Sequence, residues 1–307
     1  MPHRPSSSPH LQSAERRGPQ GRRAVIRAGV LAASLATLLS AASLDPATAA
    51  PASASASASV RPDAATTDVL ALVQPQQKAR VTTAVFDLDG TGREPAVHGD
   101  DTPYDTASIV KVDILAAALL RAQDTGRALT VQERAQAESM IERSDNTAAN
   151  ALWRRIGLAP GLEAANKRLG LTSTKGGPGA KWGLTRTTAS DQIRLLRAVF
   201  DTSPTSHASS TALNKASRTY IRTLMTRIVG EQAWGVSAAT GSGWALKNGW
   251  LQRNTTGLWD VNSVGQVTAS GRHYLVAVLS DGNTSMTNGI ALVEREARAA
   301  VISATAH

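Results

Sequence analysis

Apolar and polar residues recur with two different periods along this chain, and each period is typical of one kind of secondary structure. Runs rich in β-branched and aromatic residues predict five strands, at 80–88, 93–99, 243–252, 257–269 and 272–282. Apolar residues spaced three and four apart predict helices, at 108–123, 130–144, 147–157, 161–170, 187–200, 213–228 and 287–304. A shorter amphipathic helix is expected at 66–78, where Pro75 disturbs it.

The order of these elements indicates the fold class. Two strands, a long helical section, three strands and one helix do not alternate as a parallel βαβ fold must. The first two strands are separated by only a few residues, so they should pair as an antiparallel hairpin. The sequence therefore predicts an α+β fold: a five-stranded antiparallel sheet built from both chain ends, flanked by terminal helices, with an inserted all-helical lobe.

The first 65 residues do not have the composition of a folded domain. Residues 1–49 combine arginines, an apolar stretch and small residues, which is the pattern of an export signal. Arg22 and Arg23 favour the twin-arginine route, and 47–49 fits a cleavage site, although a retained single-span anchor is the alternative. Residues 50–65 form a Pro/Ala/Ser linker. We therefore expect one domain at 66–307, secreted or associated with the cell wall.

Composition excludes several kinds of chemistry. The chain has no cysteine, which removes disulfides, thiolate metal sites and a cysteine nucleophile. The net charge is +9, but six arginines against two acids in the leader account for +4, leaving +5. This excess suits an anionic surface such as a cell wall and does not predict nucleic-acid binding. The histidines show no metal-binding spacing, and we expect no metal or organic cofactor.

The stretch "VFDLDGTG" at 85–92 resembles the opening signature of phosphatases that use an aspartate nucleophile, which would be Asp87. That signature requires a parallel sheet with a crossover helix after the strand. Here a second strand follows within a few residues, and Asp-Gly is itself a turn signal. A hairpin turn is therefore the preferred interpretation, and a phosphatase is kept as an alternative.

Three short motifs carry candidate chemistry. Ser108 and Lys111 lie three residues apart at the start of an apolar helix, so their side chains share one face. A buried lysine with a lowered pKa can activate a serine hydroxyl, whereas the ordinary alternative is a helix-start serine followed by a surface lysine. The segment 144–146, Ser-Asp-Asn, joins two predicted helices, where a helix cap is the ordinary alternative.

The third motif is "LKNGW" at 246–250, inside a predicted strand. Lysine and glycine in the middle of a strand indicate that another group approaches its backbone closely, or else that the strand lies at a sheet edge. Together and in this order, the three motifs resemble those of class A β-lactamases and penicillin-binding peptidases, a superfamily of serine hydrolases. The resemblance covers most of the domain and extends to "SDNTAANAL" and "YLVAVLSDG".

The resemblance implies a role for each motif residue. Ser108 would be the acylated nucleophile, Lys111 its general base, and Ser144 a proton shuttle to the leaving nitrogen. Substrate binding would fall to the remaining positions: Asn146, Lys247, Asn248, Gly249 and Trp250. Of these, Asn146 would bind the substrate amide, Lys247 would attract its carboxylate, and the backbone amides of Ser108 and Trp250 would form the oxyanion hole.

Three departures from the family pattern are visible. The separation of Ser108 and Ser144 is short, which predicts a more open cleft, and Asn248 replaces the usual threonine or serine. The segment 170–184 holds no Asp or Glu, although β-lactamases place there the glutamate that activates water. We therefore predict slow release of the acyl group, which favours a peptidase, transpeptidase or esterase over a fast β-lactamase. Trp182, Trp244 and Trp250 line a cleft or pack in the core.

The sequence thus predicts an exported serine hydrolase, monomeric, that acts through an acyl-enzyme on D-alanyl peptides, β-lactams or related amides and esters. Its partner would be a small molecule or a peptidoglycan peptide. A non-catalytic cell-wall-binding protein on the same fold is the second alternative.

Overall fold

A computed structural model describes residues 79–92, 94–202, 212–240 and 243–306. These residues belong to one compact unit that runs from residue 64 to the C-terminus. The predicted export signal at 1–49, the linker at 50–65 and the helix at 66–78 lie outside the described residues. Within the described part of the chain, no helix is both long and apolar enough to cross a membrane.

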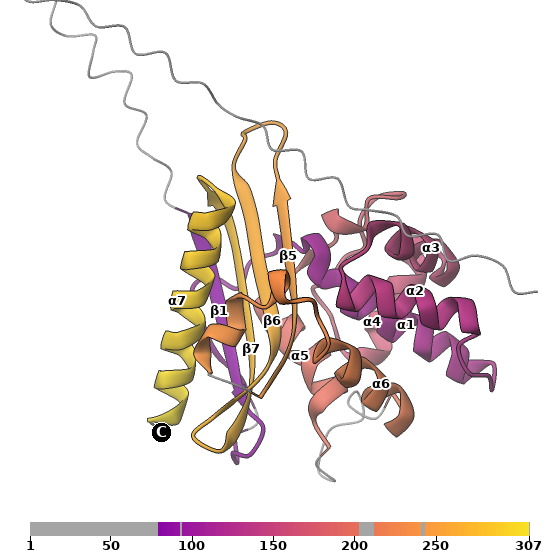
Figure 1. The fold of residues 1–307 in the computed structure, drawn as a ribbon, viewed down its shortest axis with the longest axis horizontal. Helices are drawn as coiled ribbons and strands as arrows, with labels where there is room; N and C mark the ends of the chain where they lie inside the picture. The colour runs from indigo at the N-terminus through magenta and orange to yellow at the C-terminus, as the bar shows by residue number, and fades with distance from the viewer. Residues whose placement is uncertain (1–78, 93, 203–211, 241–242, 307) are drawn as a thin grey trace, which may run out of the picture. The chain divides into compact units, whose positions relative to one another are not determined.

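A five-stranded antiparallel sheet forms the centre of the fold, as the element order predicts (Figure 1). Its strand order is β2-β1-β7-β6-β5. The strands are β1 (Arg80–Asp87), β2 (Ala96–His98), β5 (Trp244–Gln252), β6 (Trp259–Ala269) and β7 (Arg272–Asn283). The hairpin of β1 and β2 is antiparallel, with Ala84 opposite Val97. The turn interpretation of "DLDGT" is therefore confirmed.

The middle strand, β7, is buried on both faces, which explains its uninterrupted apolar sequence. Because successive side chains of a strand point to opposite faces, Leu275, Ala277 and Leu279 join one hydrophobic core. Tyr274, Val276 and Val278 join the other. This one strand thus fastens two layers of helices to the sheet.

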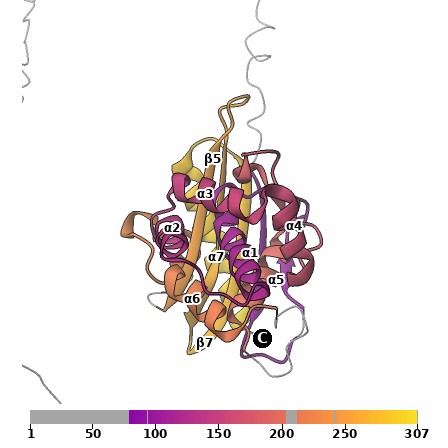
Figure 2. The same cartoon turned by 90° about the vertical axis from the view of Figure 1, so that its right-hand side faces the viewer.

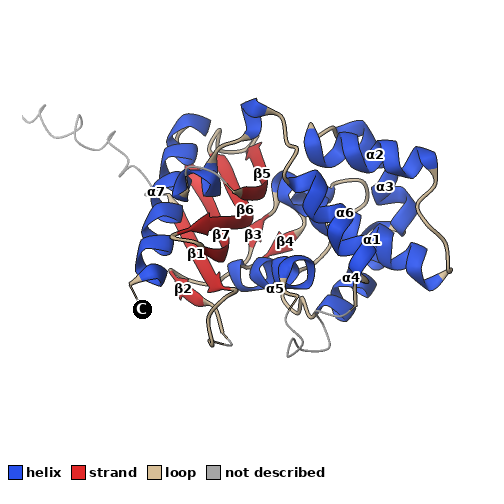
Figure 3. Ribbon diagram, turned by 60° about the horizontal axis from the view of Figure 1, so that its bottom comes forward, coloured by secondary structure: helices blue, strands red, loops and turns tan. Residues whose placement is uncertain are grey.

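The helices are arranged on both sides of the sheet (Figure 3). They are α1 (Val110–Asp124), α2 (Val131–Glu142), α3 (Asn146–Ile156), α4 (Leu158–Leu169), α5 (Ala189–Phe200), α6 (Lys215–Met225) and α7 (Met286–Thr305). Helix α7 covers one face, against β1, β6 and β7, and α5 covers the opposite face. Helices α1–α4 and α6 form the predicted inserted lobe beyond α5, and Figure 2 views the molecule from that lobe.

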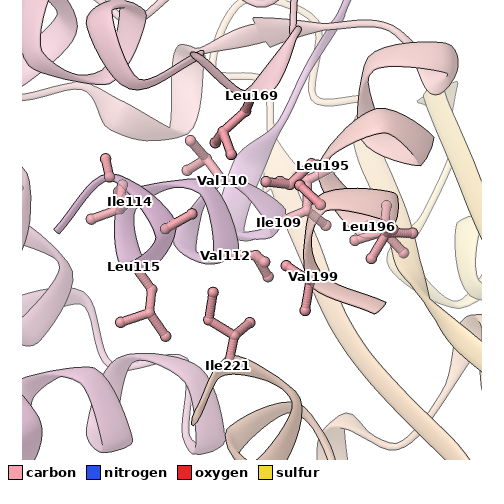
Figure 4. Close-up of a cluster of buried hydrophobic side chains, with 14 of the residues drawn as sticks. Ile109, Val110, Val112, Ile114, Leu115, Leu169, Leu195, Leu196, Val199 and Ile221 are labelled. Atoms are coloured by element: carbon pink, nitrogen blue, oxygen red, sulfur yellow. The ribbon is translucent and has the colours of Figure 1, made fainter. Parts of the chain in front are cut away.

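Helix α1 forms the core of the lobe and is buried along nearly its whole length. Its apolar side chains meet those of α4, α5 and α6, among them Leu169, Leu195 and Ile221 (Figure 4). Each fully buried Val, Leu or Ile side chain stabilises the fold by about 1.5–3 kcal/mol. Tight packing around α1 therefore fixes the position of the residues at its N-terminus.

A two-stranded sheet that the sequence did not predict lies between the lobe and the main sheet. It pairs β3 (Tyr104–Asp105) with β4 (Arg186–Thr187). Both strands have two residues, too few for a periodic pattern. The backbone N–H of Thr106, directly after β3, donates to the carbonyl of Thr185 at 2.8 Å. This small sheet holds the start of the Ser108 turn against the end of the 170–184 segment.

Candidate active site

Ser108 lies in the 3-10 turn Ala107–Ile109, which leads directly into α1. Ala107, the residue before it, has a left-handed φ of 46°, a strained conformation for a non-glycine residue. The buried side chain of Asn262 on β6 stabilises this turn, because its Nδ2 donates to the carbonyls of Asp105 at 2.9 Å and Thr106 at 3.2 Å. The helix N-terminus beyond adds positive potential where a developing oxyanion would need it.

The Lys111 amine is the centre of a hydrogen-bond network formed by the first two motifs. Its Nζ lies 2.9 Å from Ser108 Oγ, 3.0 Å from Ser144 Oγ, 2.7 Å from the Ser144 carbonyl and 2.8 Å from Asn146 Oδ1. A neutral amine has two N–H donors and one lone pair. The carbonyl and the Asn146 oxygen can therefore take both donors, which leaves the lone pair to accept the Ser108 hydroxyl.

Burial sets the protonation of this amine. Lys111 is fully buried, and burial lowers the pKa of its amine to about 7, although the Asp145 carboxylate acts in the opposite direction. At neutral pH a large fraction of Lys111 is therefore uncharged and can accept a proton. An exposed lysine, with a pKa of 10.5, would almost never be in that state.

Ser144 links the two lysines of the site. Its Oγ accepts a hydrogen bond from Lys247 Nζ at 3.0 Å and lies at the same distance from Lys111 Nζ. Ser144 has a left-handed φ of 55°, which turns the chain between α2 and α3. The next residue, Asp145, caps α3 by accepting from the Ala148 N–H at 2.6 Å. The Ser-Asp-Asn motif is therefore both a helix cap and part of the candidate site: Asp145 caps α3, while Ser144 contacts both lysines and Asn146 contacts Lys111.

Lys247 approaches from β5, the edge strand of the sheet. Its Nζ donates to the Asn248 carbonyl at 2.9 Å and approaches Gln232 Oε1 at 3.4 Å. Burial, and then the nearby Lys111, lower the pKa of Lys247 well below its ordinary value. The lobe and the sheet therefore contribute one buried amine each, and a single hydroxyl bridges them.

Gly249 permits the sheet to approach the backbone of the Ser108 turn. A Cβ at this position would lie 2.6 Å from the Ser108 nitrogen and 2.8 Å from the Ile109 nitrogen. Only a glycine fits without displacing one of the two backbones. The motif glycine therefore sets the distance between β5 and the Ser108 turn.

The predicted site residues Ser108, Lys111, Ser144, Asn146 and Lys247 thus converge on one place, joined by direct hydrogen bonds. A family model, described as the β-lactamase enzyme family, matches residues 120–304, more than half of the chain. The chain belongs to the β-lactamase enzyme family. The matched region includes Ser144, Asn146 and Lys247 and begins after Ser108 and Lys111.

Solved structures agree with this membership. The chain is similar to an L158E mutant of PBP-A in an acyl-enzyme complex with penicillin G, at 25% identity and a TM-score of 0.60, covering 76% of this chain and 91% of that one. It is also similar to a β-lactamase from Burkholderia vietnamiensis, at 23% identity and a TM-score of 0.60, covering 74% of this chain and 91% of that one. A third similar structure is the TLA-1 extended-spectrum β-lactamase, at 16% identity and a TM-score of 0.61, covering 73% of this chain and 93% of that one. No curated protein matches the chain. The protein is a serine hydrolase of the β-lactamase and penicillin-binding type.

The side chains of Asn248 and Trp250 have partners within the protein. Successive residues of a strand point to opposite faces, so Asn248 faces away from Lys247. Its buried Nδ2 donates to the carbonyls of Gln232 at 2.7 Å and Trp234 at 2.9 Å, and so it holds the segment that contains these two residues. The ring of Trp250 packs beside that of Trp234, with ring centroids 6.0 Å apart, whereas the resemblance assigns a role to the Trp250 backbone amide.

The phosphatase alternative suggested by residues 85–92 can be set aside on strand direction. Both neighbours of β1 are antiparallel to it, and the next element described after Asp87 is the strand β2, not a crossover helix. Asp87 forms an ion pair with Arg272, and Asp89 accepts from the backbone N–H of His273 at 2.7 Å. Asp87, the last residue of β1, and Asp89, in the turn after it, therefore fasten β1 to β7.

Sequence reasoning missed Gln232 and Asn262 and left the position of Trp182 open. Gln232 lies in the 3-10 turn Gly230–Gln232 and contacts Lys247. Trp182 places its ring 4.7 Å from Lys111 Nζ. None of the three has a local sequence signal, because each reaches the site through long-range packing. Among the described residues no cluster of His, Asp or Glu could hold a metal ion.

Proposed function

We propose that this protein is an exported serine hydrolase that forms an acyl-enzyme on Ser108. Its substrates are D-alanyl peptides of the cell wall, β-lactams, or related small amides and esters. The observation that carries the proposal is the contact between Ser108 Oγ and a fully buried Lys111 amine at 2.9 Å, together with the lowered pKa of that amine. Export is supported by the arginine-rich and apolar sequence of the leader.

Acylation follows from this geometry. The Ser108 hydroxyl passes its proton to the Lys111 lone pair while its oxygen attacks the substrate carbonyl carbon. The backbone amides of Ser108 and Trp250 stabilise the oxyanion, since Gly249 brings the two segments into contact. The carbon–nitrogen bond then breaks, and the proton passes from Lys111 through the Ser144 hydroxyl to the leaving nitrogen.

Substrate binding uses the remaining groups of the site. Asn146 accepts from Lys111 through Oδ1, and its Nδ2 is oriented by that bond to donate to a substrate amide carbonyl. An incoming carboxylate near Lys247 would restore the charge of that amine, because an anion favours the ammonium form. A substrate with a carboxylate is therefore attracted to the two amines together.

Slow hydrolysis of the acyl group is part of the proposal. The segment 170–184 has no carboxylate that could hold a hydrolytic water. The nearest acids along the chain have other partners: Glu163 accepts from the Gly176 N–H at 3.1 Å, and Asp191 accepts from Ser173 and Thr174 at 2.8 and 2.7 Å. This supports a peptidase, transpeptidase or esterase over a fast β-lactamase.

The test is incubation with a fluorescent penicillin, followed by intact mass spectrometry and by the rate at which the adduct disappears. We expect one adduct per chain on the wild type, none on Ser108→Ala, and decay over minutes to hours. An adduct that persists in Ser108→Ala would refute the assignment. If neither a penicillin nor a fluorophosphonate reacts, and the protein binds purified cell wall, the non-catalytic alternative takes its place.

A further inference from the structure

Trp182 stands where the 170–184 segment meets the catalytic amine. Its ring centroid lies 4.7 Å from Lys111 Nζ, within the range of a cation–π contact. The indole Nε1 donates to Asn150 Oδ1 on α3 at 2.8 Å, which fixes the orientation of the ring. The residue is half-buried and packs against the hydrophobic core of the lobe.

The backbone that carries Trp182 is held next to the nucleophile. The 3-10 turn Trp182–Leu184 packs against the Ser108 turn, and a Cβ on Gly183 would lie 3.8 Å from Ala107 Cα. The Gly177 N–H donates to Thr185 Oγ1 at 3.0 Å, which closes the segment on itself. Trp182 is therefore held in place from both its side chain and its backbone.

Hydrolysis of an acyl-enzyme requires a water molecule and a base that takes its proton. The water oxygen bonds to the ester carbonyl carbon, the bond from that carbon to Ser108 Oγ breaks, and the proton returns to Ser108 Oγ. Lys111 is a base in contact with Ser108, but four oxygens and the Trp182 ring surround its amine. A water molecule has little room to reach it.

We propose that Trp182 is a positioning residue that excludes water from Lys111 and from the acyl bond formed on Ser108. The second half of this statement rests on the proposed function, whereas the first half concerns the resting protein alone. The Trp182 ring thus keeps water away from the Lys111 amine, and it slows hydrolysis of the acyl-enzyme.

The Trp182 ring acts on the Lys111 pKa in two opposite directions: it excludes water, which lowers the pKa, and its π face attracts the ammonium form, which raises it. Two ionisable groups face the amine: the Asp145 carboxylate at the start of α3, which favours the ammonium form, and Lys247 from β5, which is joined to Lys111 through Ser144 Oγ. The π face of Trp182 also favours the ammonium form. Burial is the largest cause acting on this pKa and lowers it, and the Trp182 ring is one of the groups that bury the amine. Removing the ring should therefore raise the pKa.

The first test needs no substrate. The pKa of Lys111 is measured by NMR titration of protein labelled with ¹³C and ¹⁵N lysine, with Lys111→Arg used to assign the resonance. We expect Trp182→Ala to raise this pKa by about one unit or more, because water then solvates the ammonium. Trp182→Phe keeps an apolar ring and should stay close to the wild type. An unchanged or lowered pKa in Trp182→Ala overturns the first half of the proposal.

The second test follows the decay of the penicillin adduct in the same variants. We expect Trp182→Ala to hydrolyse the adduct about tenfold faster than the wild type, and Trp182→Phe to resemble the wild type. Unchanged or slower decay in Trp182→Ala overturns the second half. If the wild type forms no adduct, the proposed function fails, while the titration still decides whether Trp182 keeps the amine dry.

A third variant covers the case in which Trp182→Ala does not fold. Asn150→Ala keeps the indole but removes the acceptor that holds it. We expect smaller changes of the same sign in both measurements. Wild-type values in a folded Asn150→Ala protein, with Trp182→Ala unfolded, overturn the role of the anchored ring.

Discussion

Replacing Gly249 by alanine adds one methyl group at the closest approach of the sheet to the nucleophile. The new Cβ would lie 2.6 Å from the Ser108 nitrogen, 2.8 Å from the Ile109 nitrogen and 2.8 Å from the Thr106 carbonyl oxygen. An ordinary contact begins at 3.4 Å, so the two backbones must separate by about 0.8 Å, the difference between 3.4 and 2.6 Å. All three contacts are to backbone, so no side chain can move aside to relieve them.

This displacement has two costs of known size. Overpacking of a rigid interior destabilises a protein by about 1–3 kcal/mol. A shift of roughly 1 Å in a catalytic group can reduce the rate about 100-fold, which is about 2.7 kcal/mol at 1.36 kcal/mol per decade. We therefore expect a folded Gly249→Ala protein whose second-order rate of acylation by a fluorescent penicillin is about 30–100-fold below the wild type.

The control is Gly92→Ala, because a Cβ on Gly92 would meet no atom within 4 Å. Its acylation rate and its stability in urea should both match the wild type. A folded Gly249→Ala protein that acylates at the wild-type rate would show that β5 and the Ser108 turn are farther apart than described. The same rate loss in Gly92→Ala would remove the specific link to the site.

Three further predictions concern titration and proton transfer. The acylation rate should rise with pH through a limb near pH 7, as the Lys111 amine loses its proton, and Lys111→Met should lower the rate about 100- to 10,000-fold. Ser144→Ala removes the hydroxyl between Lys111 and Lys247 and should slow acylation about 100-fold or more. Asp113→Asn should raise the free energy of unfolding at pH 8 by several kcal/mol, with an upper bound of about 5, measured by urea denaturation.

The sign of the Asp113 prediction follows from burial. Burial in α1 raises the pKa of this carboxyl to about 8, with Asn166 opposing the rise and Asp191 adding to it. Between the ordinary value of 3.8 and about 8, the folded state therefore holds a proton that the unfolded state has lost. The free energy of unfolding must fall as pH rises through that window, and Asn, which does not titrate, removes the slope. Identical slopes in wild type and Asp113→Asn would contradict this assignment.

The sequence could predict the fold because its local signals agree with the long-range packing. The β-branched run of β7 and the short connection from β1 to β2 fix strand type and direction. The contact of Ser108 with Lys111 was also predictable, since helical geometry alone joins residues three apart. Asn248 was not, because its side-chain direction depends on the register of β5 and on the carbonyls of a distant turn.

Contacts between elements that are distant in the sequence determine the remaining features of the site. Asn262 reaches the Ser108 turn only because β6 lies beside β5, and Trp182 reaches Lys111 only because the 170–184 segment folds back over α3. The lowered pKa of Lys111 has the same origin, since a surface lysine at this spacing would have the same sequence motif. Periodicity identifies elements, but these properties arise where separate elements meet.

The position of β7 in the sheet has a consequence for synthesis of the chain. Among the described strands β7 is the last in chain order, yet it lies in the middle of the sheet, between β1 and β6. Until residues 272–283 have been synthesised, the hairpin of β1 and β2 cannot pair with the rest of the sheet, which consists of β6 and of β5 with its Lys247. The five-stranded sheet therefore cannot be completed before β7 has been synthesised, and β7 then joins the β1–β2 hairpin to β6 and β5 in one step.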